Sequence, residues 1–172
     1  MPFVVRPGRH GDAEALPDIE RDAGRRFAAI PDLAWIAGDA VMSAEAHAAA
    51  VMAGALWVAE DDRGALVGFL AAEGVPDALH IWEMAVRIDA QGQGVGGRLL
   101  AAAADHAGRL GLPAVTLTTF RDAPWNAPFY ARHGFRILEA DELGHRLEAV
   151  LSQEAAAGLP ADRRCAMAMP VR

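Results

Sequence analysis

Seven consecutive residues, 91–97, combine four glycines with a position directly before a predicted amphipathic helix. The four glycines are Gly92, Gly94, Gly96 and Gly97. Apolar and β-branched residues predict a strand over 79–88, and apolar residues at helical spacing predict a helix over 95–110. Backbone N–H groups at a helix N-terminus lack partners inside the helix and lie at the positive end of its dipole. Because glycine has no Cβ to keep a ligand away, this segment is predicted to bind a phosphate or a diphosphate.

The elements that must position this loop follow from apolar spacing and from turn residues. Strands are expected at 3–7, 56–60, 66–72, 79–88, 114–120, 135–138 and 164–170, and helices at 10–29, 43–52, 95–110, within 123–135 and at 141–157. Ser43 is a natural N-cap, Gly111 and Gly134 are helix stops, and residues 30–39 are expected to form a loop. Antiparallel strands followed by strand–helix–strand–helix–strand indicate an α+β fold. We expect one domain, residues 1–172, with a mixed, mostly antiparallel sheet flanked by helices.

Composition and charge exclude several classes of protein. The net charge of −7 argues against a nucleic-acid partner, because binding phosphates needs a basic stripe. All sixteen basic residues are Arg, and without Lys neither a Walker-type phosphate loop nor a Schiff base can form. The single Cys165 permits no internal disulfide, and the histidines lack metal-ligand spacing, so no metal is expected. No apolar run is long enough to span a membrane and no signal peptide is recognised, so we expect a cytoplasmic protein without membrane contact.

Two classes of phosphate ligand are open at this point. Gly92-x-Gly94-x-x-Gly97 also matches the fingerprint of dinucleotide-binding folds, which needs an acidic residue at the end of the next strand. The next predicted strand ends in Thr-Thr-Phe at residues 118–120, without an acid. That fingerprint also usually opens its domain, whereas several predicted elements precede it here. A dinucleotide is therefore the weaker interpretation.

A second group of residues follows the glycines farther along the chain. It runs Asn126-x-x-Phe129-Tyr130-x-x-His133-Gly134-Phe135. Together with Gln91-x-x-Gly94-x-Gly96, it resembles the GNAT superfamily of acyl-CoA-dependent N-acyltransferases. The resemblance covers residues 55–139, with the core motifs in 79–135. It implies a GNAT-like fold and transfer of an acetyl group from acetyl-CoA to a primary amine, by direct attack in a ternary complex.

The resemblance also implies which residues bind the acetyl-CoA. Backbone N–H groups of residues 91–97 would hold the pyrophosphate, and the preceding strand would be splayed from its neighbour to offer backbone groups to the pantetheine arm. The implied binding residues are Met84, Ala85, Val86, Gln91, Gly92, Gln93, Gly94, Val95, Gly96, Gly97, Asn126, Phe129, Tyr130 and Arg132. One backbone N–H group of the strand would also polarise the thioester carbonyl.

The catalytic groups are likewise implied by the resemblance. Tyr130, the only tyrosine of the chain, falls where the family has its general acid. A phenol with a reference pKa of about 10 can protonate a departing thiolate, whose thiol has a reference pKa of about 8.5. For the base, His80 has the family's position, and its ordinary pKa of about 6.5 suits the task. Glu83 is the alternative if a bulge near Met84 turns it inward, and a third alternative is that neither is essential.

The sequence departs from the simplest family plan over residues 140–163, which insert a helix before the last strand. This insertion would either wall the pocket of a small-molecule or peptide amine acceptor or form a homodimer contact. Two rival functions stay open. One is a non-catalytic CoA-binding module for regulation or interaction, and the other is a covalent acyl route through Cys165.

Overall fold

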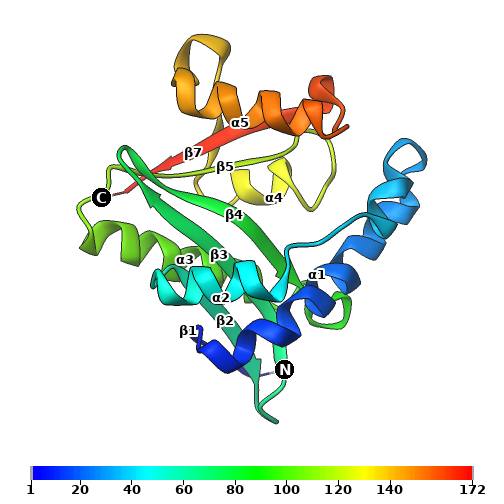
Figure 1. Ribbon diagram of the computed structural model, residues 1–172, viewed down its shortest axis with the longest axis vertical. Coiled ribbons are helices and arrows are strands. Elements are labelled where there is room, and N and C mark those ends of the chain that lie inside the picture. Colours follow the sequence, from blue (N-terminus) through cyan, green and yellow to red (C-terminus); the bar gives the residue numbers. More distant parts are fainter. Residues whose placement is uncertain (1, 172) are drawn as a thin grey trace. The chain divides into compact units, whose positions relative to one another are not determined.

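The computed structural model describes residues 2–171, in which strands and helices follow one another along most of the chain (Figure 1). The strands are β1 (Phe3–Pro7), β2 (Leu56–Asp61), β3 (Leu66–Val75), β4 (Ala78–Val86), β5 (Ala114–Phe120), β6 (Arg136–Ile137) and β7 (Arg164–Pro170). The α-helices are α1 (Leu16–Gly24), α2 (Ala44–Met52), α3 (Val95–Arg109), α4 (Ala127–Ala131) and α5 (Gly144–Ala156). The 3₁₀ helices are η1 (His10–Ala15), η2 (Arg25–Ala29), η3 (Pro31–Gly38), η4 (Ile88–Ala90), η5 (Ala140–Glu142) and η6 (Ala161–Arg163).

The strands of the described residues join in the order β1-β2-β3-β4-β5-β7-β6. β4 and β5 are parallel, whereas the β1–β2, β2–β3, β5–β7 and β6–β7 pairs are antiparallel. This order confirms the expected α+β fold with a mixed, mostly antiparallel sheet. By its contacts the chain divides into two compact units, residues up to 73 with 82–105, and 74–81 with 106 onward. The single domain expected over the whole chain stays a prediction.

In the first unit, helices cover both faces of the sheet. One face buries an apolar cluster made of Leu16, Ile19, Leu56, Val58, Phe69, Ala71 and Ala85. Because side chains alternate along a strand, the members from β2 and β3 stand two residues apart and point toward α1. Ala50 and Val51 of α2 pack against the same cluster. On the opposite face, a Cβ on Gly68 would come within 3.2 Å of Val95, at the start of α3.

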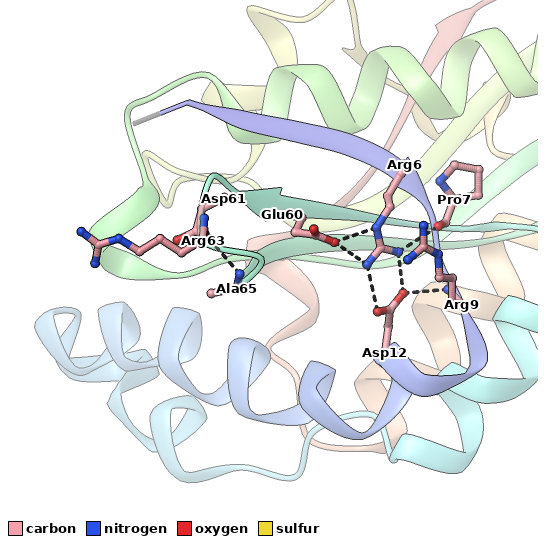
Figure 2. A network of polar contacts seen from close by, with 8 residues as sticks. All are labelled: Arg6, Pro7, Arg9, Asp12, Glu60, Asp61, Arg63 and Ala65. Carbon is pink, nitrogen blue, oxygen red and sulfur yellow. Dashed lines mark hydrogen bonds and ion pairs between the residues drawn. The ribbon is translucent and has the colours of Figure 1, made fainter.

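Arg6 of β1 links three elements of the first unit (Figure 2). Its guanidinium donates to Glu60 of β2 at 2.6 and 2.8 Å and to Asp12 of η1 at 2.7 and 3.1 Å. Asp12 also accepts a hydrogen bond from the backbone N–H of Arg9 at 2.7 Å. The hydrogen bond from Arg6 lowers the pKa of Asp12 below its usual value. These charge-assisted contacts fasten the first helical turn to the edge of the sheet.

In the second unit, Glu154 fastens α5 to two strands. Its carboxylate accepts a hydrogen bond from the hydroxyl of Thr118 in β5. It also accepts two hydrogen bonds from Arg164 of β7, at 2.9 and 3.0 Å. Leu147 and Val150 of the same helix are buried. α5 is therefore a packed part of this unit.

The N-terminal helical region differs from its prediction. The continuous helix expected over 10–29 is α-helical only in α1, with 3₁₀ turns before and after it. Pro17, at the start of α1, has no N–H to donate, so an α-helix cannot run through it from residue 10. The loop expected at 30–39 is wrong, because Pro31–Gly38 form η3. This turn is anchored by Leu33, which is fully buried.

The boundaries of two other elements, β4 and α4, differ from those predicted. β4 ends at Val86 rather than at residue 88, because the N–H of Ile88 donates to the side chain of Asp22 at 2.8 Å and η4 begins there. The helix expected within 123–135 is limited to Ala127–Ala131. The predicted cap of α2 is confirmed, since the Ser43 hydroxyl accepts a hydrogen bond from the backbone N–H three residues later at 3.2 Å.

Over residues 2–171, the helices are too short or too polar to cross a membrane.

Candidate active site

Residues 91–97, called the glycine loop from here on, lie in the first unit and lead into α3. Gly92 and Gly94 have φ angles of +75° and +86°, a region that side-chain-bearing residues occupy only with strain. A Cβ on either glycine would meet no protein atom within 4 Å, so conformation rather than crowding requires glycine. α3 begins at Val95, and the N–H of Arg98 donates to the carbonyl of Gly94 at 3.2 Å. The N–H groups of the first turn before Arg98 therefore lack partners inside the helix, which is what an anion site needs.

The end of β4 leads into this loop through η4. Glu83, Met84 and Val86 are half-buried there, and Ala85 is buried. The N–H of Met84 donates to Oε1 of Glu83 at 3.2 Å, so a candidate base covers a backbone group expected to bind a ligand. The carbonyl of Val86 accepts a hydrogen bond from Nε2 of Gln91 at 2.7 Å. A ligand that uses the Met84 N–H must therefore displace the Glu83 carboxylate from it.

Two residues that the sequence analysis did not single out support this segment. Asp22 of α1 accepts a hydrogen bond from the N–H of Ile88 at 2.8 Å. Arg26 of η2 donates from Nη1 to Oε1 of Gln91 at 2.5 Å. Asp22 and Arg26 stand four residues apart, a spacing that places two side chains on one face of a helix. From the sequence, that spacing predicts that the two side chains share a helix face. It does not predict that they contact Ile88 and Gln91.

His80 of β4 is fully buried in the second unit. Its Nδ1 lies 2.9 Å from the Thr116 hydroxyl oxygen of β5 and 3.3 Å from Nη1 of Arg146 in α5. A guanidinium can only donate, so Nδ1 accepts and the neutral ring carries its proton on Nε2. Arg146 also donates to the Thr116 hydroxyl at 3.3 Å and to Asp77 at 3.0 Å. α5 thus places the guanidinium of Arg146 beside the candidate base.

This environment changes the acid–base behaviour of His80. Burial, with a smaller contribution from the charge of Arg146, lowers the pKa of His80 to about 4, while Asp77 opposes the shift. The ring is therefore neutral at pH 7 and a weaker base than an exposed imidazole. Arg146 stands 66 positions from His80 in the chain, and no local spacing signals such a contact.

Tyr130 lies on α4 of the second unit and is 8% exposed. The rings of Phe129 and Phe135 pack edge-on against its ring, with centroid distances of 5.3 and 5.7 Å. Its backbone N–H donates to the carbonyl of Asn126 at 3.0 Å, and its carbonyl accepts from the N–H of Phe135 at 3.2 Å. Backbone hydrogen bonds and ring contacts together fix the position of this phenol.

Asn126 and Arg132, both expected to bind the cofactor, are held differently. Nδ2 of Asn126 donates to the Thr119 hydroxyl at 2.7 Å, while its Oδ1 is buried without a hydrogen-bond partner among the described residues. A buried acceptor without a partner costs about 1–3 kcal/mol, so this oxygen suits a donor brought by a ligand. Arg132 is exposed, donates to the carbonyl of Pro128 at 3.2 Å and lies 5.9 Å from the ring centroid of Phe129.

Cys165 lies buried in β7, and burial raises the pKa of its thiol. An enclosed, protonated thiol is a poor nucleophile. Across residues 2–171, no three His, Cys, Asp or Glu side chains gather closely enough to hold a metal ion.

The fold is that of solved N-acetyltransferases. The PaiA N-acetyltransferase from Thermoplasma acidophilum, solved in complex with coenzyme A, is 17% identical with a TM-score of 0.71, over 99% of each chain. The ribosomal-protein-S18-alanine N-acetyltransferase from Escherichia coli is 16% identical with a TM-score of 0.68, over 99% of this chain and 94% of that one. N-acetylglutamate synthase from Neisseria gonorrhoeae, solved with coenzyme A and N-acetyl-glutamate, is 21% identical with a TM-score of 0.71. The match covers all of this chain but only 36% of that one.

A match to a family model supports a family assignment in addition to the shared fold. The model of the acetyltransferase (GNAT) domain matches residues 53–137, a stretch that includes the glycine loop and Tyr130. Residues 53–137 are therefore a GNAT acetyltransferase domain.

Proposed function

We propose that the protein transfers an acetyl group from acetyl-CoA to a primary amine while both substrates are bound. The observation that carries this proposal is the glycine loop, whose left-handed glycines lead into α3 inside the matched region, where the first-turn amides lack partners inside the helix. Coenzyme A is present in two of the similar structures, PaiA and N-acetylglutamate synthase, which supports it as the carrier here.

In the proposed reaction, backbone N–H groups of residues 91–97 hold the pyrophosphate of acetyl-CoA. Backbone groups of Met84 and Val86 hold the pantetheine, and the N–H of Met84 polarises the thioester carbonyl after Glu83 has moved away. The buried oxygen of Asn126 accepts from an amide of the pantetheine arm, and Arg132 pairs with a phosphate of the nucleotide. The unpaired Oδ1 of Asn126 supports its assignment. The Met84 N–H already donates to Glu83 and the Val86 carbonyl already accepts from Gln91, so the first must be released before it can meet the cosubstrate.

The chemical step needs an acid and a base. The lone pair of the neutral amine attacks the thioester carbon, and collapse of the tetrahedral intermediate breaks the C–S bond and expels the thiolate of CoA. Tyr130 donates its phenolic proton to that sulfur, and the proton lost by the amine passes to the base. The phenolate then regains a proton from solvent.

Glu83 is the base that the contacts favour. It is half-buried and lies beside the Met84 N–H, from which the thioester would displace it, whereas His80 is fully buried and its Nδ1 accepts from Arg146. The lowered pKa of His80 also makes the imidazole a weak proton acceptor. His80 remains the alternative, and a relay of water and backbone carbonyls is the third.

The acceptor that we propose is a small-molecule or peptide amine, met by a protein in the cytoplasm. The net charge of −7 favours cationic acceptors, because an acidic surface raises their local concentration. N-acetylglutamate synthase was solved with an acylated amino acid, which makes amino acids a sensible first class to test.

The test is a thiol-release assay with acetyl-CoA over a panel of amino acids, polyamines, aminoglycosides and peptide N-termini. We expect thiol release that depends on one class of amine and yields its acetylated product. Tight binding of acetyl-CoA without turnover on any class would favour the non-catalytic module. An acetylated Cys165 in the trapped enzyme would favour the covalent route.

A further inference from the structure

The glycine loop is tied to the N-terminal helical region at two points on either side of η4. The N–H of Ile88, the first residue of η4, donates to Oδ2 of Asp22 at 2.8 Å. Just after η4, the side chain of Gln91 accepts from Nη1 of Arg26 at 2.5 Å. Both contacts join segments more than sixty positions apart in the chain and lie within the first unit.

The amide of Gln91 is used at both of its ends. Its Nε2 donates to the carbonyl of Val86 at 2.7 Å, while its Oε1 accepts from Arg26. Arginine can only donate and a carbonyl can only accept, so the amide has one orientation that satisfies both neighbours. The side chain therefore fixes the last residue of β4 against the first residue of the glycine loop.

We propose that Asp22 and Arg26 are positioning residues that hold the glycine loop in the shape that binds the diphosphate of CoA. This proposal rests on the proposed function and adds two residues that do not touch the cosubstrate. A loop held in its bound shape before the ligand arrives loses less conformational entropy on binding. Arg26 acts through Gln91 on the start of the loop, and Asp22 acts through Ile88 on the turn before it.

Neighbouring charges on the same helical segment provide matched controls. Arg21 and Asp18 form a surface pair at 2.7 Å with both side chains more than half exposed. Arg25 pairs with Asp22 at 3.3 Å, but its own side chain is 71% exposed. Exposed pairs of this kind contribute about 0–1 kcal/mol, so their loss removes charge without removing the contacts to η4 and the loop.

The experiment compares Arg26→Met with Arg21→Met in the full-length protein by calorimetric titration with CoA. Arg26→Met is expected to weaken CoA binding about tenfold, because a charge-assisted hydrogen bond to Gln91 is lost. Arg21→Met should bind CoA like the wild type. With the active amine, the loss should fall on the KM for acetyl-CoA rather than on kcat, and Arg26→Lys should restore part of it.

A double-mutant cycle separates a specific contact from a general loss of structure. Gln91→Met and Arg26→Met are expected to be non-additive, so the double variant should bind CoA about as weakly as either single variant. Asp22→Ala is expected to weaken binding, whereas Arg25→Met, which breaks only the surface pair with Asp22, should not.

Hydrogen–deuterium exchange of the free protein tests the same clamp without any ligand. Amides of residues 88–97 should exchange faster in Arg26→Met than in Arg21→Met. If the wild type does not bind CoA, the proposed function fails, and faster exchange in Arg26→Met would still show a clamp on the loop. Unchanged exchange together with unchanged CoA affinity in Arg26→Met would overturn the inference.

Discussion

The glycine loop of the first unit and the surroundings of His80 in the second unit hold their functional groups in opposite ways. In the loop, backbone conformation does the positioning, since Gly92 and Gly94 take left-handed angles that leave open space where a Cβ would point. Around His80, side chains do it, since Thr116 and Arg146 converge on one ring nitrogen. The glycine loop should therefore be sensitive to substitutions that change its backbone conformation, and the surroundings of His80 to substitutions that remove a side-chain partner.

Burial shifts the pKa of titratable groups in both units. In the first unit, burial raises the pKa of Glu20 to about 7, and its carboxylate lies 3.9 Å from Nε2 of the buried His47. In the second unit, burial lowers the pKa of His80 to about 4. Between pH 4.5 and 6.5, Glu20 therefore retains a proton that it would release in the unfolded chain, whereas His80 lacks a proton that it would bind there.

The largest effect is expected from the phenol of the second unit. Tyr130→Phe keeps the ring and its contacts with Phe129 and Phe135 but removes the proton that we propose is donated to the departing sulfur. We expect kcat to fall by roughly 10²–10⁴-fold, the range for a positioned general acid. Steady-state kinetics measures this, with CoA affinity and the thermal midpoint as controls. An unchanged kcat would remove Tyr130 from the catalytic proposal.

The next effect concerns stability as a function of pH. Between pH 6.5 and 4 the unfolded chain binds a proton at His80 that the folded chain does not, so acidification costs about 3 kcal/mol of unfolding free energy. Between pH 4.5 and 7 Glu20 acts in the opposite sense, since its folded form retains the proton and stability falls as pH rises. Burial also lowers the pKa of His47, which adds to the trend set by His80.

Glu20→Gln separates these opposing contributions. Urea unfolding from pH 4.5 to 7 should show stability that rises with pH more steeply for the variant than for the wild type. His80→Asn should shift the slope in the opposite direction. A Glu20→Gln profile parallel to that of the wild type would contradict the buried acid.

A smaller effect is expected from the backbone of the glycine loop. Gly94→Ala should weaken CoA binding about tenfold, because a Cβ at φ +86° costs about 1–2 kcal/mol and projects where the diphosphate is proposed to lie. Gly54→Ala is the matched control, since Gly54 has φ +72° and equally open space but lies after α2. Both variants should lose similar stability by urea unfolding, and only Gly94→Ala should lose CoA affinity. Equal CoA affinity in Gly94→Ala and Gly54→Ala would show that the glycine loop does not bind CoA.

The smallest effect is expected at Cys165. Cys165→Ala should leave kcat unchanged, because the thiol is buried and burial raises its pKa. Its only consequence should be a stability loss of about 1 kcal/mol from the small cavity, measured by urea unfolding. Loss of turnover with retained folding would revive the covalent route.

Sequence reasoning succeeds where the physical cause is local. The glycine loop follows from neighbouring residues, since positive φ angles and a helix start depend on the next few positions, and both are found there. The cap at Ser43 is confirmed for the same reason. The strands expected from apolar spacing are likewise found and join into the expected mixed, mostly antiparallel sheet.

Contacts between distant segments could not be predicted in this way. Arg146 reaches His80 across 66 positions, and Asp22 reaches Ile88 across the same separation. Each contact depends on how elements pack rather than on spacing along the chain. The pKa of His80 illustrates the consequence, since the residue type indicates a value of about 6.5 and the packing sets about 4.

A crystal structure of the protein with acetyl-CoA would show whether the glycine loop binds the cosubstrate. We expect the diphosphate of CoA within hydrogen-bond distance of backbone N–H groups of residues 91–97, and the thioester sulfur within reach of the Tyr130 hydroxyl. A diphosphate bound elsewhere, with the amides of residues 91–97 left to solvent, would contradict this expectation.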